Sequence, residues 1–350
     1  MGARAIAGAW ETCRCIRDFV DKNFSDLVRL ASGHVEARMV QIAVQLGLFD
    51  CIGDRTLDAK QVAVSLATDL RATELLLNSL TALSLLEKKD EQFSLSTAAG
   101  TYLTSNSPKS LCGMIRFDAS LWNCWDKLAD AVRSGKPARP ANMYQDDPGE
   151  TETFIQAMDS LVRARGDAEV LVTALDWEKV TDLLDIGSGP ATYPIHLCRR
   201  FPKLRATIFD LPATLRITER YVREAGLESR IKLVSGDYRK DSIPERYDVI
   251  FLSNIIHSEG SEENQKLMTK LAANLNAGGR MIVKDHILDE TRANPPVGAI
   301  FSMLMLLTTV SGRCYSFNEV KSWLLSAGLH SVRQIDLPPP LTSSLIIGEK

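Results

Sequence analysis

Metal ligands and disulfide frameworks are scarce in this sequence. Its seven cysteines lie at positions 13, 15, 51, 112, 124, 198 and 314, and none forms the C-x-x-C pair that typically holds zinc. The closest spacing, Cys13 and Cys15, has no second pair nearby, so ordinary helix residues are the favoured interpretation. We therefore expect reduced thiols and no bound metal.

Signs of a membrane or nucleic-acid partner are equally sparse. No stretch approaches the roughly 18 apolar residues that cross a bilayer, and the first residues lack the cationic flank and apolar core of an export signal. Met1-Gly2 begins a myristoylation pattern, but Ile6 stands where that pattern needs Ser or Thr. The formal net charge of -3 leaves no positive excess for a polyanion. These absences predict a cytoplasmic protein that binds neither membranes nor nucleic acid.

The first half of the chain has a helical pattern. From about residue 8 to residue 170, apolar residues recur mostly at three- and four-residue steps, as they do between Val35 and Leu48. Longer helices are predicted over 118–133 and over 154–174. A chain of 350 residues suggests two domains of roughly 100–200 residues each, and we place the boundary after residue 175.

One segment of this half has the order of a winged helix. A capped helix is predicted to begin at Thr56-Leu57-Asp58 and a second to span 72–86, followed by a polar turn and a short strand at Phe93 and Leu95. The second helix is rich in leucine and has only Arg71 near its start. This composition favours packing or dimerisation over contact with DNA.

The second half alternates strands with helices. Apolar runs rich in β-formers and separated by helical stretches predict a parallel sheet with helices on both faces. The runs are residues 183–186, 206–209, 231–234, 249–252 and 280–283, and a final pair, 332–335 and 344–347, is predicted to close the sheet as a hairpin. We therefore predict an α/β fold, in which a mostly α-helical, winged-helix-like domain (1–175) precedes a Rossmann-like domain (176–350).

A glycine-rich loop follows the first of these strands. In Asp185-Ile186-Gly187-Ser188-Gly189 the glycines permit a tight turn and let a ligand approach the backbone at the start of the next helix. The dinucleotide pattern G-x-G-x-x-G fails because Thr192 takes the place of its third glycine, which argues against NAD or flavin. Asp185 instead offers a carboxylate to a cationic ligand, and S-adenosylmethionine is such a cation.

Two further acids stand at strand ends. Asp210, in Phe209-Asp210-Leu211-Pro212, comes about twenty residues after the glycine turn, the distance at which an acid binds ribose hydroxyls. Asp237, in Gly236-Asp237-Tyr238, is placed to accept a hydrogen bond from an adenine amino group, with a helix cap as the alternative. Together with the glycine loop, these acids predict a cofactor that contains adenosine.

A histidine follows a fourth strand. The segment 252–257 ends in His257, just beyond the carboxyl end of the strand, where ligands of open α/β sheets bind. Histidine is the side chain best suited to accept a proton near neutral pH. His257 is therefore the candidate general base, and an incidental position among five histidines is the alternative.

These motifs resemble those of class I S-adenosylmethionine-dependent methyltransferases, specifically the two-domain small-molecule O-methyltransferase family of plant phenylpropanoid and bacterial polyketide or phenazine pathways. The resemblance spans most of the chain. It rests on residues 35–50, 131–137, 183–189, 209–212, 236–237, 278–283 and 311–313. The first of these segments is similar to the family's dimerisation helix, so the resemblance implies a homodimer.

The resemblance also implies roles for single residues. His257 would deprotonate the acceptor hydroxyl, and carboxylates at Asp285 and at position 314 would hold it in place. Cys314 cannot act as a carboxylate, and Ser258 replaces the Asp that usually follows the histidine. The implied cofactor contacts are Asp185, Gly187, Gly189, Asp210, Leu211, Gly236, Asp237, Tyr238 and Ser253, the last in place of a common Lys.

Soft and aromatic side chains are predicted to line an acceptor pocket between the domains, because such groups suit a flat ring. They are Trp122, Trp125, Phe154, Met158, Phe301, Met303 and Met305. The run from Phe301 to Met305 resembles the family's substrate-helix segment. The alternative is that half of the set belongs to the core.

The predicted function is S-adenosylmethionine-dependent methylation of a hydroxyl on a small aromatic metabolite of secondary metabolism. The departures at Cys314 and Ser258 leave C- or N-methylation, hydroxylation or decarboxylation with the same cofactor as alternatives. A ligand-responsive winged-helix DNA-binding protein is a second alternative, disfavoured because Leu70 to Phe93 carries no basic stripe. An NAD-linked oxidoreductase is a third.

Overall fold

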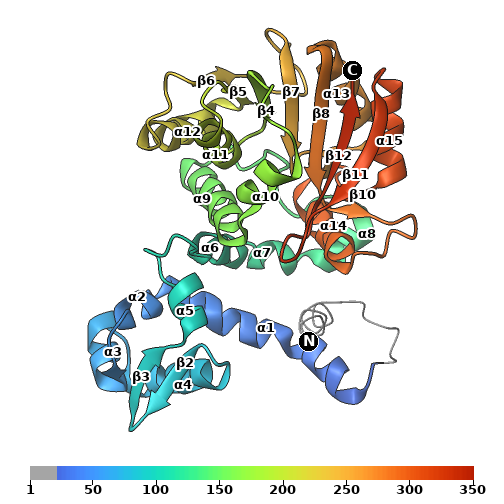
Figure 1. The fold of residues 1–350 in the computed structure, drawn as a ribbon. Coiled ribbons are helices and arrows are strands. Elements are labelled where there is room, and N and C mark those ends of the chain that lie inside the picture. The colour runs from blue at the N-terminus through green and yellow to red at the C-terminus, as the bar shows by residue number, and fades with distance from the viewer. Residues whose placement is uncertain (1–21) are drawn as a thin grey trace, which may run out of the picture. The chain divides into compact units, whose positions relative to one another are not determined.

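The computed structural model describes residues 22–350. They fall into two compact units, one ending at Ser94 and the other extending from Leu95 to Lys350 (Figure 1). The Met1-Gly2 pattern, Cys13, Cys15 and the start of the predicted helical segment lie outside the described residues. The domain boundary after residue 175 was placed where the sequence pattern changes, and it stays a prediction.

The first unit is a small helical domain with a three-stranded sheet. Its helices are α1 (Phe24–Gln45), α2 (Leu48–Ile52), α3 (Ala59–Leu66) and α4 (Leu70–Ala82), and its strands β1 (Leu57–Asp58), β2 (Leu86–Lys89) and β3 (Gln92–Leu95) pair in the order β1-β3-β2. Asp58 and Asp69 cap α3 and α4, each accepting a hydrogen bond from a backbone N–H of the first turn. The predicted order of two helices and a wing is confirmed.

Helix α1 leaves most of its apolar side chains uncovered. Only Ala43 and Val44 of its 22 residues are buried. Phe24 is 82 % exposed and Leu30 is 59 % exposed. An apolar helix face left uncovered in this way is typical of an association surface.

The second unit is an α/β domain. Its helices are α5 (Thr97–Tyr102), α6 (Cys112–Ser120), α7 (Trp122–Trp125), α8 (Leu128–Ser134), α9 (Pro148–Arg165), α10 (Asp167–Ala174), α11 (Thr192–Arg200), α12 (Pro212–Glu224), the 3₁₀ turn η1 (Ile256–Ser258), α13 (Ser261–Ala273), α14 (Pro296–Thr308) and α15 (Phe317–Ser326). Its strands are β4 (Asp182–Ile186), β5 (Arg205–Asp210), β6 (Ile231–Ser235), β7 (Tyr247–Ser253), β8 (Leu275–Asp285), β9 (Ile287–Leu288), β10 (Tyr315–Ser316), β11 (His330–Asp336) and β12 (Ser344–Glu349).

Seven of these strands form one sheet in the order β11-β12-β8-β7-β4-β5-β6. Strands β4 to β8 run parallel, and β12 pairs antiparallel with both β8 and β11. The predicted strands and the closing hairpin are therefore confirmed. Strand β4 lies between β5 and β7, so the chain order reverses there, and ligands of open α/β sheets bind at such a switch point.

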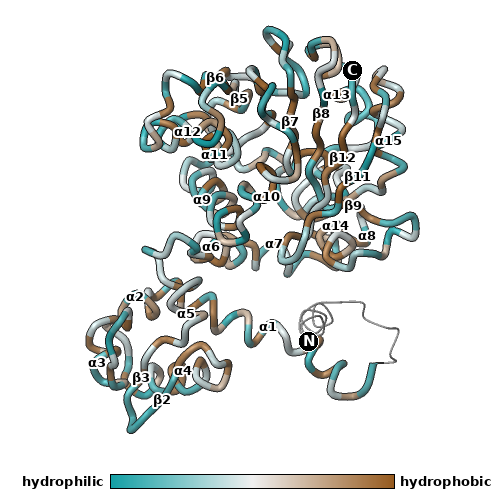
Figure 2. The backbone as a smooth tube through the Cα atoms, viewed as in Figure 1, coloured by the Kyte–Doolittle hydropathy of each residue, from teal (hydrophilic) through white to brown (hydrophobic). Residues whose placement is uncertain are grey.

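The sheet is buried on both faces. Leu183 packs in a cluster with α10, α11 and α12, whereas the next residue of β4, Leu184, packs in a cluster with α13 and α15. Figure 2 shows hydrophobic colour along the central strands β7 and β8. Burial on both faces explains why these strands appear in the sequence as nearly continuous apolar runs.

Three helix predictions need correction. The predicted helix 118–133 is divided among α6, α7 and α8, because the chain turns at Leu121 and again at Asp126 and Lys127. The predicted helix 154–174 begins earlier, after the cap at Asp147, and Gly166 divides it into α9 and α10 by adopting a left-handed conformation (φ 72°). The predicted helix 72–86 is wrong at its end, where Leu86 starts β2.

Candidate active site

A single pocket gathers all the predicted cofactor residues. It has an empty volume of about 1030 Å³ and lies at the carboxyl ends of β4, β5, β6 and β7, with α9 along one side. Its lining includes Asp185, Gly187, Gly189, Asp210, Leu211, Gly236, Asp237, Tyr238 and Ser253. Residues from four separate strand ends thus meet at the switch point of the sheet. Their roles toward a cofactor stay predictions.

The glycine loop is shaped by close packing. Gly187 and Gly189 have φ values of 62° and 60°, which glycine adopts without strain. A Cβ atom on Gly187 would lie 2.5 Å from Cδ1 of Ile255, and one on Gly236 would collide with the ring of Phe209. The missing side chains therefore let Ile255 and Phe209 pack directly against the backbone at the bottom of the pocket.

Asp210 holds the glycine loop in place. Its Oδ2 accepts a hydrogen bond from the backbone N–H of Gly189 at 2.9 Å, and its Oδ1 accepts one from Leu211 at 2.7 Å. Burial raises the pKa of Asp210 to about 6, against the lowering effect of these hydrogen bonds. The carboxyl is therefore mostly ionised at pH 7 and keeps further lone pairs for ligand hydroxyls.

Asp185 lies beneath the same loop. Ser188 donates a hydrogen bond from Oγ to Oδ2 of Asp185 at 2.6 Å. Burial raises the pKa of Asp185 to about 8, and the nearby carboxyl of Asp210 adds to this rise. At pH 7 Asp185 is therefore mostly protonated, and a cationic ligand would draw it toward the ionised form.

The carboxylate of Asp237 is bound by the side chain of Arg239, two positions later in the chain. Arg239 donates to both of its carboxylate oxygens, from Nε at 2.8 Å and from Nη2 at 2.9 Å. The hydrogen bond from Arg239 lowers the pKa of Asp237 more than burial raises it. No helix begins in the described turn after Asp237, so the alternative role as a helix cap is not found.

A positive wall that the sequence did not predict completes the pocket. Arg165 lines the pocket and binds Asp167 through two hydrogen bonds, from Nε at 3.0 Å and Nη2 at 2.9 Å. The same Asp167 forms a buried ion pair with Nζ of Lys284 at 3.0 Å and accepts a hydrogen bond from Tyr193. Burial lowers the pKa of Lys284, and Arg165 is the cation of this group that lines the pocket, so its guanidinium is the group placed to bind a ligand carboxylate.

The stronger sequence signal for this wall was Arg165-Gly166-Asp167, which the predicted continuous helix concealed. Lys284 gave a weaker signal, a lysine inside an otherwise apolar strand.

His257 and Asp285 form a buried pair near this pocket. Strand β7 ends at Ser253 in the pocket wall, and the η1 turn then places His257 beside the end of β8. Nδ1 of His257 lies 2.8 Å from Oδ1 of Asp285. A carboxylate at Nδ1 holds the proton on that nitrogen and leaves Nε2 unprotonated, as a general base requires.

The carboxyl of Asp285 stays ionised although it is buried. Burial alone would raise its pKa, but the contacts with His257 and His286 outweigh burial and hold the pKa below its usual value. The backbone N–H of His286 donates to Oδ1 of Asp285 at 2.7 Å. This fixed carboxylate can stabilise the imidazolium that forms when His257 takes up a proton.

Cys314 is buried and neutral. Burial raises the pKa of its thiol to about 12, and the neighbouring charge of Asp285 adds to this. Its backbone N–H donates to Oγ of Ser302 at 3.1 Å. Asp285 therefore supplies the negative charge beside His257, with no second carboxylate at position 314.

The predicted acceptor residues all belong to the second unit, but only some lie together. Phe154 and Met158 line the pocket, and the ring of Phe301 stands edge-on to His257 at 4.9 Å. The others are outside the lining of this pocket: Trp122 and Trp125 in α7, and Met303 and Met305 in α14. Their contact with an acceptor stays a prediction, and Met305 is 6 % exposed, as a core residue would be.

Two other kinds of site are absent from the described residues. Residues 22–350 hold no group of three or more His, Cys, Asp or Glu side chains placed to bind a metal ion. Within the same range, no helix combines the length and apolar character needed to cross a membrane.

Family models match both halves of the chain. A model described as the O-methyltransferase domain matches residues 125–330, and one described as the O-methyltransferase dimerisation domain matches residues 28–105. Among curated proteins, the chain is 30% identical over 332 residues to the tetracenomycin polyketide synthesis 8-O-methyl transferase TcmO of Streptomyces glaucescens, which covers 93% of this chain and 96% of that protein. It is 28% identical over 330 residues to the 3-hydroxy-5-methyl-1-naphthoate 3-O-methyltransferase of Streptomyces sahachiroi, covering 93% and 94%.

Solved structures show the same architecture. The chain is similar to human N-acetylserotonin methyltransferase in complex with SAM, with a TM-score of 0.85, 25% identity and coverage of 95% and 99% of the two chains. It is similar to PigF with SAH, with a TM-score of 0.86, 27% identity and coverage of 94% and 100%. The predicted fold class is therefore confirmed.

Proposed function

The chain belongs to the O-methyltransferase family and uses S-adenosylmethionine as its methyl donor, and we propose that it methylates a hydroxyl of a small aromatic metabolite with His257 as general base. The observation that carries this proposal is the buried pair of His257 and Asp285. His257 comes only four residues after Ser253, which lines the pocket. A hydroxyl must lose its proton as it gains a methyl group, and this pair provides a place for that proton.

The residues of the pocket fit each part of the cofactor. Asp210 would accept from the ribose hydroxyls, Asp237 would accept from the adenine amino group, and the wall at Arg165 would hold the carboxylate. Asp185 would face the positive charge of the methionine portion. When bound, the cofactor supplies a methyl group on a positively charged sulfur.

The protein's own part in the reaction is alignment and proton transfer. The acceptor oxygen gains the methyl group, the donor is left as a neutral thioether, and the hydroxyl proton passes to Nε2 of His257. Alignment of two reactants can contribute about 7–11 kcal/mol, and a positioned base contributes typically about 10²–10⁴-fold. Asp285 stabilises the resulting imidazolium, because its carboxylate is already in hydrogen-bond contact with Nδ1.

We propose a flat, aromatic acceptor. Two relatives are named for 8-O-methyl transfer in polyketide synthesis and for a hydroxynaphthoate. In this chain Phe154, Met158 and Phe301 offer apolar surface at the pocket and beside the base. The alternatives of DNA binding and NAD-linked oxidation have no support in this family.

We further propose that the chain works as a homodimer in the cytoplasm. The dimerisation-domain match over 28–105 and the uncovered apolar residues of α1 support self-association. The cysteines 51, 112, 124, 198 and 314 are free thiols, which fits a reducing compartment.

A direct assay tests the proposed reaction. The purified protein should convert S-adenosylmethionine to S-adenosylhomocysteine when naphthols or hydroxylated polycyclic phenols are added, and mass spectrometry should detect the methyl ethers. Matched naphthylamines and aliphatic alcohols should react far more slowly. Methylation of the amines or of ring carbons at rates equal to the phenols would overturn the hydroxyl assignment.

Cofactor binding should release protons at pH 7. Burial raises the pKa of Asp185 to about 8, so the empty pocket holds a mostly protonated carboxyl, and a cation beside it favours the ionised form. Calorimetric titration of S-adenosylmethionine in two buffers of different ionisation enthalpy should therefore give different apparent enthalpies. The difference should shrink in Asp185→Asn. A buffer-independent enthalpy in the parent protein would show that Asp185 does not change its protonation on binding.

A further inference from the structure

We propose that Tyr315 and Asn264, together with Tyr238, act as positioning residues that hold the turn carrying His257, and we call this set the turn clamp. The inference rests on the proposed function, because it assumes that His257 is the base. It goes further by naming residues that fix the backbone on which the base stands.

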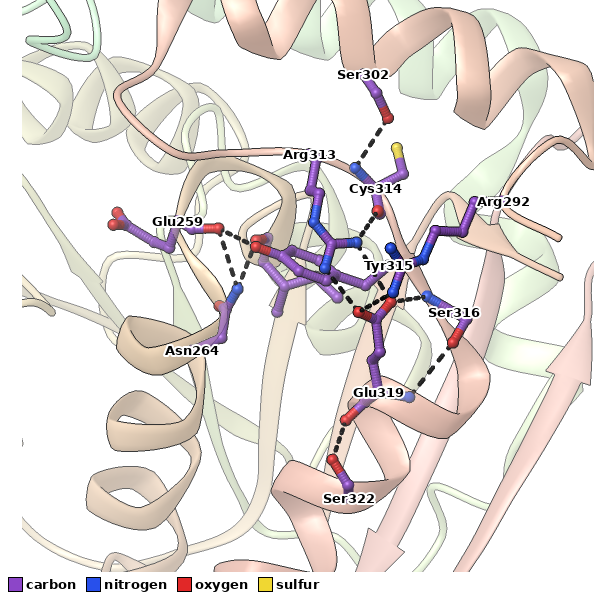
Figure 3. A network of polar contacts seen from close by, with 11 residues as sticks. Glu259, Asn264, Arg292, Ser302, Arg313, Cys314, Tyr315, Ser316, Glu319 and Ser322 are labelled. Carbon is purple, nitrogen blue, oxygen red and sulfur yellow. Dashed lines mark hydrogen bonds and ion pairs between the residues drawn. The ribbon is translucent and has the colours of Figure 1, made fainter. Parts of the chain in front are cut away.

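Tyr315 and Asn264 form hydrogen bonds to the backbone at both ends of the turn that carries His257. Tyr315 donates a hydrogen bond from its hydroxyl to the carbonyl oxygen of Glu259 at 2.5 Å. Asn264 donates from Nδ2 to the carbonyl of Ile256 at 2.8 Å and to that of Glu259 at 3.3 Å. Figure 3 shows both side chains converging on Glu259. Ile256 and Glu259, on either side of His257, are thereby tied to α13 and to β10.

Tyr315 is itself held from several sides. The guanidinium of Arg313 lies 4.2 Å from the centre of its ring, and Nη2 of Arg313 forms an ion pair with Glu319 at 2.6 Å. Glu319 also accepts a hydrogen bond from the backbone N–H of Ser316 at 2.9 Å, as Figure 3 shows. The ring of Trp323 stands edge-on to Tyr315 at 4.8 Å. A hydroxyl fixed in this way can act as a rigid anchor for the turn.

The loop before Tyr315 packs directly on the same turn. A Cβ atom on Gly312 would collide with the carbonyl oxygen of His257. The Gly312 backbone N–H donates to Oγ1 of Thr309 at 2.9 Å, which holds the loop against the end of α14. The turn is therefore confined both by hydrogen bonds and by contact.

Tyr238 connects the turn clamp to the cofactor pocket. Its hydroxyl donates to Oε1 of Glu259 at 2.7 Å, while Tyr238 itself lines the pocket. The side chain of Glu259 thus accepts a hydrogen bond from Tyr238, and its backbone carbonyl accepts hydrogen bonds from Tyr315 and Asn264. A cofactor that packs against Tyr238 would act on the same residue that anchors the turn of the base.

The geometry of the base explains why such a clamp matters. Asp285 holds the His257 ring through Nδ1, whereas Asn264 and Tyr315 hold the backbone from which that ring projects. A catalytic group must stay within about 0.5 Å of its productive position, and a shift of about 1 Å can cost about 10²-fold in rate. Removing one of these hydrogen bonds to the turn should therefore lower the rate only by displacing His257.

A double-mutant cycle tests the proposal. Tyr315→Phe removes only the hydroxyl, and we expect kcat to fall roughly ten- to a hundredfold with unchanged affinity for S-adenosylhomocysteine. In the His257→Ala background the same substitution should change kcat by less than about twofold, because no base remains to be displaced. Tyr221→Phe, a half-buried tyrosine of α12, is the matched control and should leave kcat unchanged.

The possible outcomes separate the clamp from the function. If Tyr315→Phe lowers kcat equally in both backgrounds, or leaves the parent rate unchanged, the turn clamp is refuted while the proposed function stands. If His257→Ala is as fast as the parent, the proposed role of the base fails. Thermal unfolding identifies a variant that does not fold, and Asn264→Ala, which removes two contacts to the same turn, then takes the place of Tyr315→Phe in the cycle.

Discussion

Replacement of His257 by alanine should lower kcat by about 10²–10⁴-fold and leave the affinity for S-adenosylmethionine almost unchanged. The substitution removes the proton acceptor, whereas the pocket residues that would hold the cofactor stay in place. Some turnover should remain, because alignment of donor and acceptor does not depend on the imidazole. The loss should be smallest for the most acidic phenols, which are already partly ionised.

Initial-rate kinetics with a series of substituted phenols measures this effect. Calorimetric titration of S-adenosylhomocysteine provides the independent measure of cofactor affinity. His330→Ala, in β11 and largely exposed, is the matched control and should retain the parent kcat. A His257→Ala variant that keeps the parent rate on weakly acidic phenols would remove His257 from the mechanism.

The second large effect is expected at Asp210. Asp210→Ala should weaken cofactor binding by roughly a hundredfold, because hydrogen bonds to a charged group contribute about 1.5–3 kcal/mol each. The substitution also removes the acceptor of the Gly189 backbone N–H, so the glycine loop loses its anchor. Titration of S-adenosylmethionine and S-adenosylhomocysteine measures the change, with NAD as a ligand that should not bind. Unchanged affinity would show that Asp210 does not hold the ribose.

The same carboxyl gives cofactor binding a dependence on pH. Hydroxyl groups donate to the ionised form, and burial places the pKa of Asp210 at about 6. As the pH falls through this value, protonation competes with the ligand, so the Kd should rise between pH 7 and pH 5. Asp210→Asn, which cannot ionise, should lose this part of the pH dependence. A Kd that rises equally in Asp210→Asn would assign the titration to another group.

Local patterns were enough to find most of the cofactor pocket. Asp185 lies near the end of one predicted strand and Gly189 in the loop after it, Asp210 directly follows the next predicted strand, and parallel strands end at one edge of a sheet. Their convergence therefore follows once the strands are identified. The strands themselves could be identified because both faces of the sheet are buried, which leaves nearly continuous apolar runs.

The pairing of His257 with Asp285 was suggested by the family resemblance alone. The two residues are separated by 28 positions in the chain, and only the hydrogen-bond geometry shows that Nδ1 meets the carboxylate. The acceptor residues were harder still. Phe154 lines the pocket and Met305 is buried elsewhere, yet both look alike in sequence as apolar residues of predicted helices.

The sequence by itself determined the order of strands and helices, the glycine loop and the acids that follow each strand, because these depend on neighbours a few residues away. The tertiary structure decided the positive wall of Arg165, Asp167 and Lys284 and the contacts of Tyr315 with the turn of His257. These join residues from distant parts of the chain. Such contacts depend on how helices bend and pack, which no local periodicity encodes.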